Sequence, residues 1–223
     1  MATTKLTLKK SVSKPTTSPK LTKKEMAKEH FPMGYDLFRK NKSKIGSEDI
    51  KKYLQRFSIR YRLAKSFKEI KYSDDKLLGK TYLEAYDIGM KLFLTCTAYE
   101  LIYEACKLLK MKEVEPQNNK VELKKEVVDV LRENNLLLNL ILGFDNTKGG
   151  AIAKSIKGLQ AGKNDVLGLA IGIRNLFAHG VYTPVGAGIT SNNIDYYDAV
   201  DKAVLKYTNE LFYKCSKIIK DMK

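Results

Sequence analysis

Histidine is scarce in this chain, whose 223 residues include two, His30 and His179. The cysteines are also few, and Cys96, Cys106 and Cys215 lie far apart in apolar stretches without a C-x-x-C pair. Two histidines and three scattered cysteines are too few for the ligand cluster of a usual zinc site, so we expect no metal and no other cofactor. The separate cysteines instead indicate buried, reduced side chains, which favours a cytoplasmic location.

Long apolar runs are missing as well. The longest candidate, residues 136–144, is shorter than the roughly 20 residues of a membrane span and is interrupted by Asn139 and Gly143. The first residues lack the apolar stretch of a signal peptide, so we expect neither a signal peptide nor a membrane partner. A phosphate-binding P-loop and a G-x-S-x-G nucleophile motif are also absent, which argues against the chemistry that depends on them.

Acidic side chains are outnumbered, with 25 Asp and Glu against 41 Lys and Arg, which gives a net charge of +16. A field of that sign attracts polyanions, so nucleic acid is the leading partner class. Residues 1–24 contain seven lysines and no acidic residue. Such a segment cannot bury enough apolar surface to offset the entropy of ordering it, so we expect a disordered basic tail. The tail is either an electrostatic tether for nucleic acid or a solubilising extension.

The rest of the chain shows helical periodicity and no convincing strand alternation, which predicts an all-α fold. A helix that begins at Ser47 and continues to about residue 70 places aromatic and apolar side chains on one face and basic side chains on the other. The basic residues singled out on this helix are Lys52, Arg56, Arg60 and Lys65. They form either an RNA-binding surface or the solvated side of a helix that packs through its aromatic residues.

Periodicity and helix-end signals predict further helices along the chain. These are expected at residues 80–110, 121–142, 152–159, 165–177 and 194–220. The resulting organisation is a disordered tail at 1–24, a basic helical arm at 25–75 and a four- to five-helix bundle at 76–223.

One short motif combines a permanent positive charge with a side chain suited to proton transfer. Residues 174–179 have the sequence RNLFAH, an R-N-x-x-x-H motif that contains one of the two histidines. Arginine suits phosphate binding, and the histidine proton can move near neutral pH. On a helix Asn175 and His179 share a face, with Arg174 beside them. The negative end of the helix dipole favours a protonated His179, which suits a general acid or base.

Cleavage of RNA by the ribose 2′-hydroxyl requires a base, an acid and positive charge against the phosphoryl oxygens. Arg174 can supply the charge and His179 one of the two proton-transfer groups. His30 is distant in sequence, so a second copy of His179 across a two-fold axis most economically supplies the other group, which predicts a homodimer. The alternative interpretation is structural, with a surface arginine and a histidine that caps the helix end by bonding a free carbonyl.

An all-α bundle with an R-polar-x-x-x-H motif resembles the HEPN superfamily. Many of its members are metal-independent endoribonucleases in toxin–antitoxin, phage-defence and RNA-processing systems. The resemblance covers roughly residues 76–223, and it implies that Arg174 and His179 are catalytic and that Asn175 supports them. It also implies that two motifs meet in a homodimer. Some members add an acidic residue from an earlier helix. The matching candidates in this chain are Glu100 and Glu104.

The chain departs from one pattern of the family. Toxin members paired with a nucleotidyltransferase antitoxin often have H-x-Y after the motif, whereas this chain has H-x-x-Y with Tyr182. Modification of Tyr182 is therefore not implied. The expected function is that of a cytoplasmic, homodimeric endoribonuclease, with an antitoxin or defence-system protein as a further partner. The alternative is a non-catalytic protein that uses the same bundle for RNA binding or as a scaffold.

Overall fold

The computed structural model describes residues 30–71, 79–115, 118–145, 150–180 and 183–222. Over these residues the chain is helical and contains no strand, and one isolated antiparallel bridge joins Glu122 to Asp165. The all-α prediction is therefore confirmed. Within the same ranges no helix is long and apolar enough to cross a membrane. The tail predicted at 1–24 and Tyr182 lie outside the described residues.

Eight α-helices lie in the described part of the chain. They are α2 (Tyr35–Asn41), α3 (Glu48–Ser66), α4 (Lys80–Leu108), α5 (Lys125–Glu133), α6 (Asn135–Phe144), α7 (Ala151–Gln160), α8 (Leu167–Ala178) and α9 (Ile194–Asp221). Three short 3-10 helices are η1 (Lys42–Lys44), η2 (Lys112–Val114) and η3 (Val185–Ala187).

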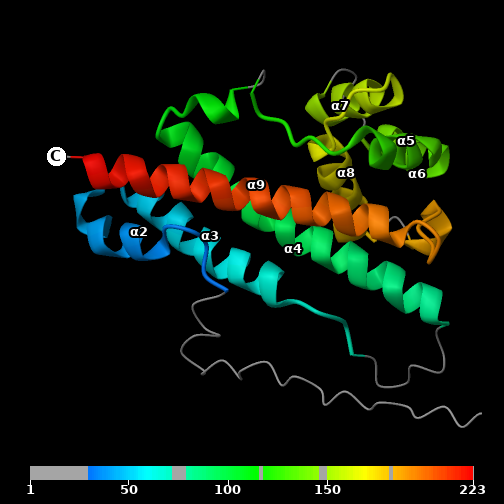
Figure 1. Ribbon diagram of the computed structural model, residues 1–223, viewed down its shortest axis with the longest axis horizontal. Helices are drawn as coiled ribbons and strands as arrows, with labels where there is room; N and C mark the ends of the chain where they lie inside the picture. Colours follow the sequence, from blue (N-terminus) through cyan, green and yellow to red (C-terminus); the bar gives the residue numbers. More distant parts are fainter. Residues whose placement is uncertain (1–29, 72–78, 116–117, 146–149, 181–182, 223) are drawn as a thin grey trace, which may run out of the picture.

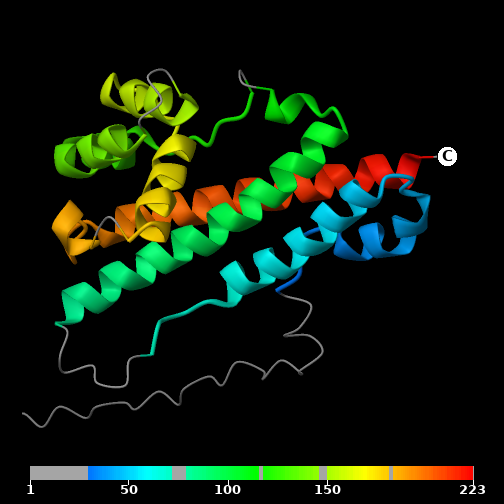
Figure 2. The same cartoon turned by 180° about the vertical axis from the view of Figure 1, so that it is seen from behind.

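The two longest helices, α4 and α9, lie side by side along the long axis of the molecule (Figures 1 and 2). α3 packs along α4 on one side of this pair, and α2 packs on the C-terminal half of α9. α8 packs on α4 on the other side and contacts α6 and α7, while α5 packs against α7 and α9. One buried cluster joins the long helices to α5–α8, and a second joins them to α2 and α3. The long helices therefore connect the two parts of the core.

The predicted basic arm packs on this core. Ser47 caps α3 by accepting a hydrogen bond from the Ile50 amide at 3.4 Å, as the sequence predicts. On the inward side of α3, the fully buried ring of Phe57 stacks on Phe212 of α9 with centroids 5.0 Å apart. The aromatic side of α3 is thus buried while its basic side stays exposed. α3 and α4 contribute to the same buried cluster, so the core does not separate the arm from the bundle. The boundary near residue 75 therefore stays a prediction.

In the described part of residues 76–223 there are six helices, α4 to α9, where four or five were predicted. The reason lies in the region predicted as one helix at residues 121–142, where Asn134 separates α5 from α6. Its side chain accepts a hydrogen bond from the Leu137 amide at 3.2 Å. It also donates to the Tyr197 hydroxyl at 2.9 Å and to the Ala187 carbonyl at 3.0 Å. These bonds to distant residues offset the helical bond lost at the break.

Candidate active site

α8 carries the R-N-x-x-x-H motif, and local interactions define both of its ends. At its start the Asp165 carboxylate accepts hydrogen bonds from the amides of Leu167 at 3.1 Å and Val121 at 3.0 Å. The first bond satisfies a helix-end amide, and the second joins α8 to the segment before α5. Beyond its end Gly180 has a φ of +62°, a left-handed conformation that stops the helix without a clash from a Cβ.

Phe177, inside the motif, packs the last turn of α8 against α4. Its ring centroid lies 6.3 Å from that of Tyr86 and 6.2 Å from that of Phe93. A Cβ at Gly89 would come within 2.8 Å of the Phe177 ring, so α4 needs a glycine at this point of close approach. An apolar residue of the motif therefore sets the position of its polar neighbours.

Arg174 is directed at α4. Its guanidinium forms an ion pair with Glu100, and 18% of the arginine side chain is exposed against 49% of the glutamate side chain. The Nε atom is buried and has no hydrogen-bond partner among the described residues. Burial raises the pKa of the nearby Cys96 thiol to about 12, and the charge of Arg174 opposes this rise. The positive charge of Arg174 is thus held partly inside the molecule, with a more exposed carboxylate next to it.

Of the two candidate acids, Glu100 reaches the motif and Glu104 does not. Glu104 pairs with Lys107 on its own helix, with the Oε1 and Nζ atoms 3.2 Å apart. Because an arginine–carboxylate pair has a strong directional preference, Glu100 determines where the guanidinium of Arg174 lies.

His179 directly follows the last residue of α8, and it is exposed. Its amide donates to the carbonyl oxygen of Asn175 at 3.1 Å, so these two residues lie one above the other, as predicted. The imidazole packs on the ring of Phe144 at the end of α6, with centroids 5.2 Å apart and planes 43° apart. This contact leaves the imidazole exposed, as proton exchange with a bound substrate requires.

Within one chain, the two ionisable side chains of the motif have different neighbours. Five residues of an α-helix correspond to a rotation of about 140°. Accordingly, Arg174 contacts α4, whereas His179 contacts α6. Asn175 and His179 share a face as predicted, but Arg174, which was expected beside them, is directed at α4 and is not presented together with His179.

Two open grooves, of about 540 and 270 Å³, lie elsewhere on the described surface. The larger is lined by residues 120–123 and by α9, and the smaller by α4 and the first turns of α9. Neither includes a residue of the motif, so the motif lies on a surface outside both grooves. Among the residues with described positions, no three His, Cys, Asp or Glu side chains are placed to hold a metal ion.

The basic residues of α3 do not all lie on one side of the helix. Lys52, Arg56 and Arg60 are exposed and spaced four residues apart along the side opposite the buried Leu54. Lys65 is exposed too, but it follows Leu54 by eleven residues, about three full turns, and so lies on the inward side near the helix end. The fold therefore groups three of the four residues predicted to bind RNA.

Two buried polar features were missed at the level of sequence. Asp201 on α9 has 7% of its surface exposed. Its spacing of four residues from the buried Tyr197 could have indicated this position. Cys106 and Cys215 come from different helices, and their sulfur atoms lie 3.5 Å apart although 109 positions separate them along the chain. No local pattern could have indicated that pair.

Comparison with known proteins assigns no family, since no protein-family model, curated protein or solved structure matches this chain. Its function is therefore inferred from the motif and from the side chains around it.

Proposed function

We propose that this protein is a homodimeric, HEPN-type endoribonuclease that cleaves RNA through attack of a ribose 2′-hydroxyl on the adjacent phosphate. The observation that carries the proposal is the placement of two motif side chains. Arg174 is held by Glu100 of α4, and His179 is exposed at the end of α8. The first is a fixed positive charge and the second a proton-transfer group. The net charge of +16 attracts the RNA.

In the proposed reaction, Arg174 stabilises negative charge on the phosphoryl oxygens through charge-assisted hydrogen bonds. His179 either accepts the proton of the attacking 2′-hydroxyl or donates a proton to the leaving 5′-oxygen. Because each chain has one such histidine, a second chain supplies the other proton-transfer group. Asn175 lies one turn before His179, as their backbone hydrogen bond indicates, and its side chain is assigned the supporting role beside the imidazole. The products are a 2′,3′-cyclic phosphate and a 5′-hydroxyl.

Incubation of purified protein with labelled single-stranded RNA in EDTA tests this proposal. We expect fragments that end in a 2′,3′-cyclic phosphate. The rate should fall by roughly 10²- to 10⁴-fold in His179→Ala and in Arg174→Ala, which lack the proton-transfer group and the charge on the phosphate.

Arg132→Ala is the matched control for this assay. Arg132 also pairs with an acid, Asp129, at 3.0 Å, but it lies on α5 outside the motif, so the control should cleave at the wild-type rate. Intact RNA after incubation with the wild type, or equal cleavage by His179→Ala, would contradict the nuclease function.

A second candidate function is RNA binding or scaffolding without catalysis. The same ion pair favours it, because an arginine whose side chain is 18% exposed and whose charge is neutralised by Glu100 also suits a structural role. A protein of this kind would bind the labelled RNA and leave it intact. An antitoxin or defence-system protein is a proposed partner under either function.

A further inference from the structure

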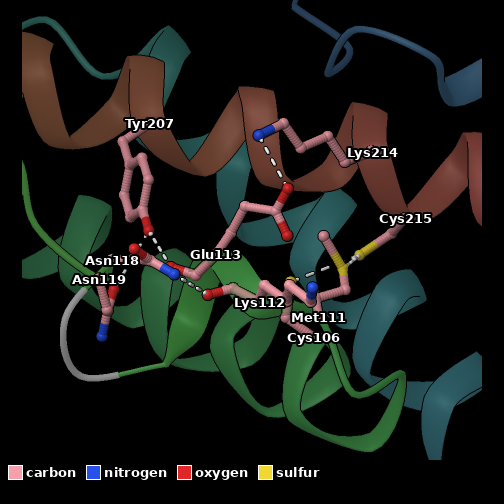
Figure 3. Close-up of polar contacts among 9 residues, drawn as sticks. All are labelled: Cys106, Met111, Lys112, Glu113, Asn118, Asn119, Tyr207, Lys214 and Cys215. Atoms are coloured by element: carbon pink, nitrogen blue, oxygen red, sulfur yellow. Dashed lines mark hydrogen bonds and ion pairs between the residues drawn. The ribbon is translucent and has the colours of Figure 1, made fainter.

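Three sulfur atoms meet in the core between α4 and α9 (Figure 3). The Sγ atoms of Cys106 on α4 and Cys215 on α9 lie 3.5 Å apart, and the Cys215 thiol donates to the Sδ atom of Met111 at 3.4 Å. Both cysteines are fully buried free thiols. Cys96 also lies on α4, but it belongs to the other cluster of the core. The three thiols of the chain therefore divide into a close pair and a separate one.

The segment after α4 keeps this contact in place. The Met111 amide donates to the carbonyl of Cys106 at 3.0 Å. Two residues later, the Glu113 carboxylate accepts a hydrogen bond from Lys214 at 3.0 Å, and the Glu113 carbonyl accepts one from the Tyr207 hydroxyl at 3.1 Å. Figure 3 shows that both donors come from α9, where Tyr207 and Lys214 precede Cys215 along the helix. These two bonds thus hold η2, the segment that directly follows α4, against α9.

We propose that Cys106 and Cys215 are a modification site, at which hydrogen peroxide forms a disulfide that joins α4 to α9. The peroxide oxidises one thiol to a sulfenic acid and is reduced, giving one water. The second thiol then attacks that sulfur, and the sulfenic oxygen leaves as a second water. Two electrons pass from the sulfur atoms to the peroxide, and both thiol protons leave in the waters. The inference does not depend on the proposed nuclease function.

The native arrangement favours this bond but makes its formation slow. A disulfide needs its sulfur atoms about 2.05 Å apart, so side-chain rotation must shorten the present contact of 3.5 Å. The hydrogen bond with Cys106, followed by burial, raises the pKa of the Cys215 thiol and so leaves little reactive thiolate. Access for the oxidant requires opening near the end of α9, which ends at Asp221, six residues after Cys215. The expected reaction is a slow response to sustained oxidation.

Treatment of the whole protein with hydrogen peroxide, followed by alkylation and peptide mass spectrometry, tests the proposal. We expect a link between Cys106 and Cys215, with Cys96 left free. The thermal midpoint should rise by roughly 5–10 °C, and dithiothreitol should reverse this rise. Cys96→Ala is the matched control, because Cys96 is equally buried on the same helix, and it should form the link at the wild-type rate. Cys106→Ala should form none.

The identity of the two linked cysteines also shows whether the disulfide formed in the folded protein or in an unfolded chain. Loop closure in an unfolded chain favours a link between Cys96 and Cys106, ten residues apart, over one that spans 109 residues, by roughly thirtyfold. Oxidation of the wild type is therefore repeated in urea just below the unfolding transition, where the peroxide has access. The link between Cys106 and Cys215 should still dominate. A predominant link to Cys96, or no link under either condition, would overturn the proposal.

Discussion

Glu100 and Glu104 lie one turn apart on α4 and each forms an ion pair, the first with Arg174 and the second with Lys107. Glu104 is therefore a matched control for Glu100. In Glu100→Gln the guanidinium loses its carboxylate and is positioned less well, so RNA cleavage should slow by roughly tenfold. The free energy of unfolding should fall by about 1 kcal/mol or less, because the pair is partly exposed. Initial cleavage rates and urea unfolding measure these effects. Glu104→Gln should behave as the wild type, and equal slowing in both variants would remove the special role of Glu100.

Asp201 links stability to pH. Its Oδ1 atom has no hydrogen-bond partner among the described residues, and burial raises its pKa from 3.8 to about 6. Because the folded state binds this proton more tightly than the unfolded chain, the resulting stabilisation is fully present below a pH of about 4 and is lost as the pH rises through about 6. At neutral pH the loss is about 2–3 kcal/mol. Urea unfolding of Asp201→Asn should therefore give a higher free energy than the wild type at neutral pH and a similar one in acid.

Asp198, one turn earlier on α9, provides a control of opposite sign. Burial opposes its ionisation, but hydrogen bonds from Lys202 and Lys91 lower the pKa of its carboxyl overall. The folded state therefore binds the Asp198 proton less tightly, and this stabilisation is present above a pH of about 4 and is lost in acid. Asp198→Asn should be less stable than the wild type at neutral pH. If Asp198→Asn and Asp201→Asn shifted stability in the same direction there, the assignment of opposite environments would be wrong.

Among the helices, α3 allows a test of RNA binding with one helix as its own control. Arg60 lies on the outward side with Lys52 and Arg56, whereas Lys65 lies on the inward side. Arg60→Glu should remove a phosphate contact, so the slope of log binding constant against log salt concentration should become shallower by about 0.7 for single-stranded RNA. Lys65→Glu changes the net charge equally and should leave the slope unchanged. Fluorescence anisotropy at several salt concentrations measures both, and equal changes would indicate a response to net charge alone.

For the whole molecule, the proposed active site requires two chains, because one chain supplies a single His179 at the motif. Light scattering at micromolar concentration should therefore report twice the chain mass. Mixing provides a sharper measurement. His179→Ala chains are mixed in ninefold excess with wild-type chains and allowed to exchange freely. Roughly a hundredth of the dimers then contain two wild-type chains, whereas roughly a tenth of all chains are wild type. RNA cleavage should follow the lower fraction. Activity proportional to the wild-type chains, or a monomeric mass, would contradict the shared site.

Most of the helices and the motif could be located from local sequence, because the interactions that define helix ends are short-range, although α2 was not predicted and α5 and α6 were predicted as one helix. Ser47 accepts a hydrogen bond three residues along the chain, Asp165 accepts one two residues along, and Gly180 ends α8 through its own conformation. Burial of the cysteines also followed from the apolar residues around them. The resemblance to HEPN proteins depends on the same local pattern, and it stays a proposal for this chain.

The partners of the polar residues were decided by tertiary structure alone. Asn134 breaks a predicted helix because its amide bonds residues 53 and 63 positions away. Arg174 pairs with Glu100, although two glutamates one turn apart were equal candidates. Cys106 meets Cys215 across two helices. Periodicity specifies which side of a helix is apolar, but it does not specify the distance and angle at which two helices pack. Those two quantities determine which side chains meet, so no local pattern contains the answer.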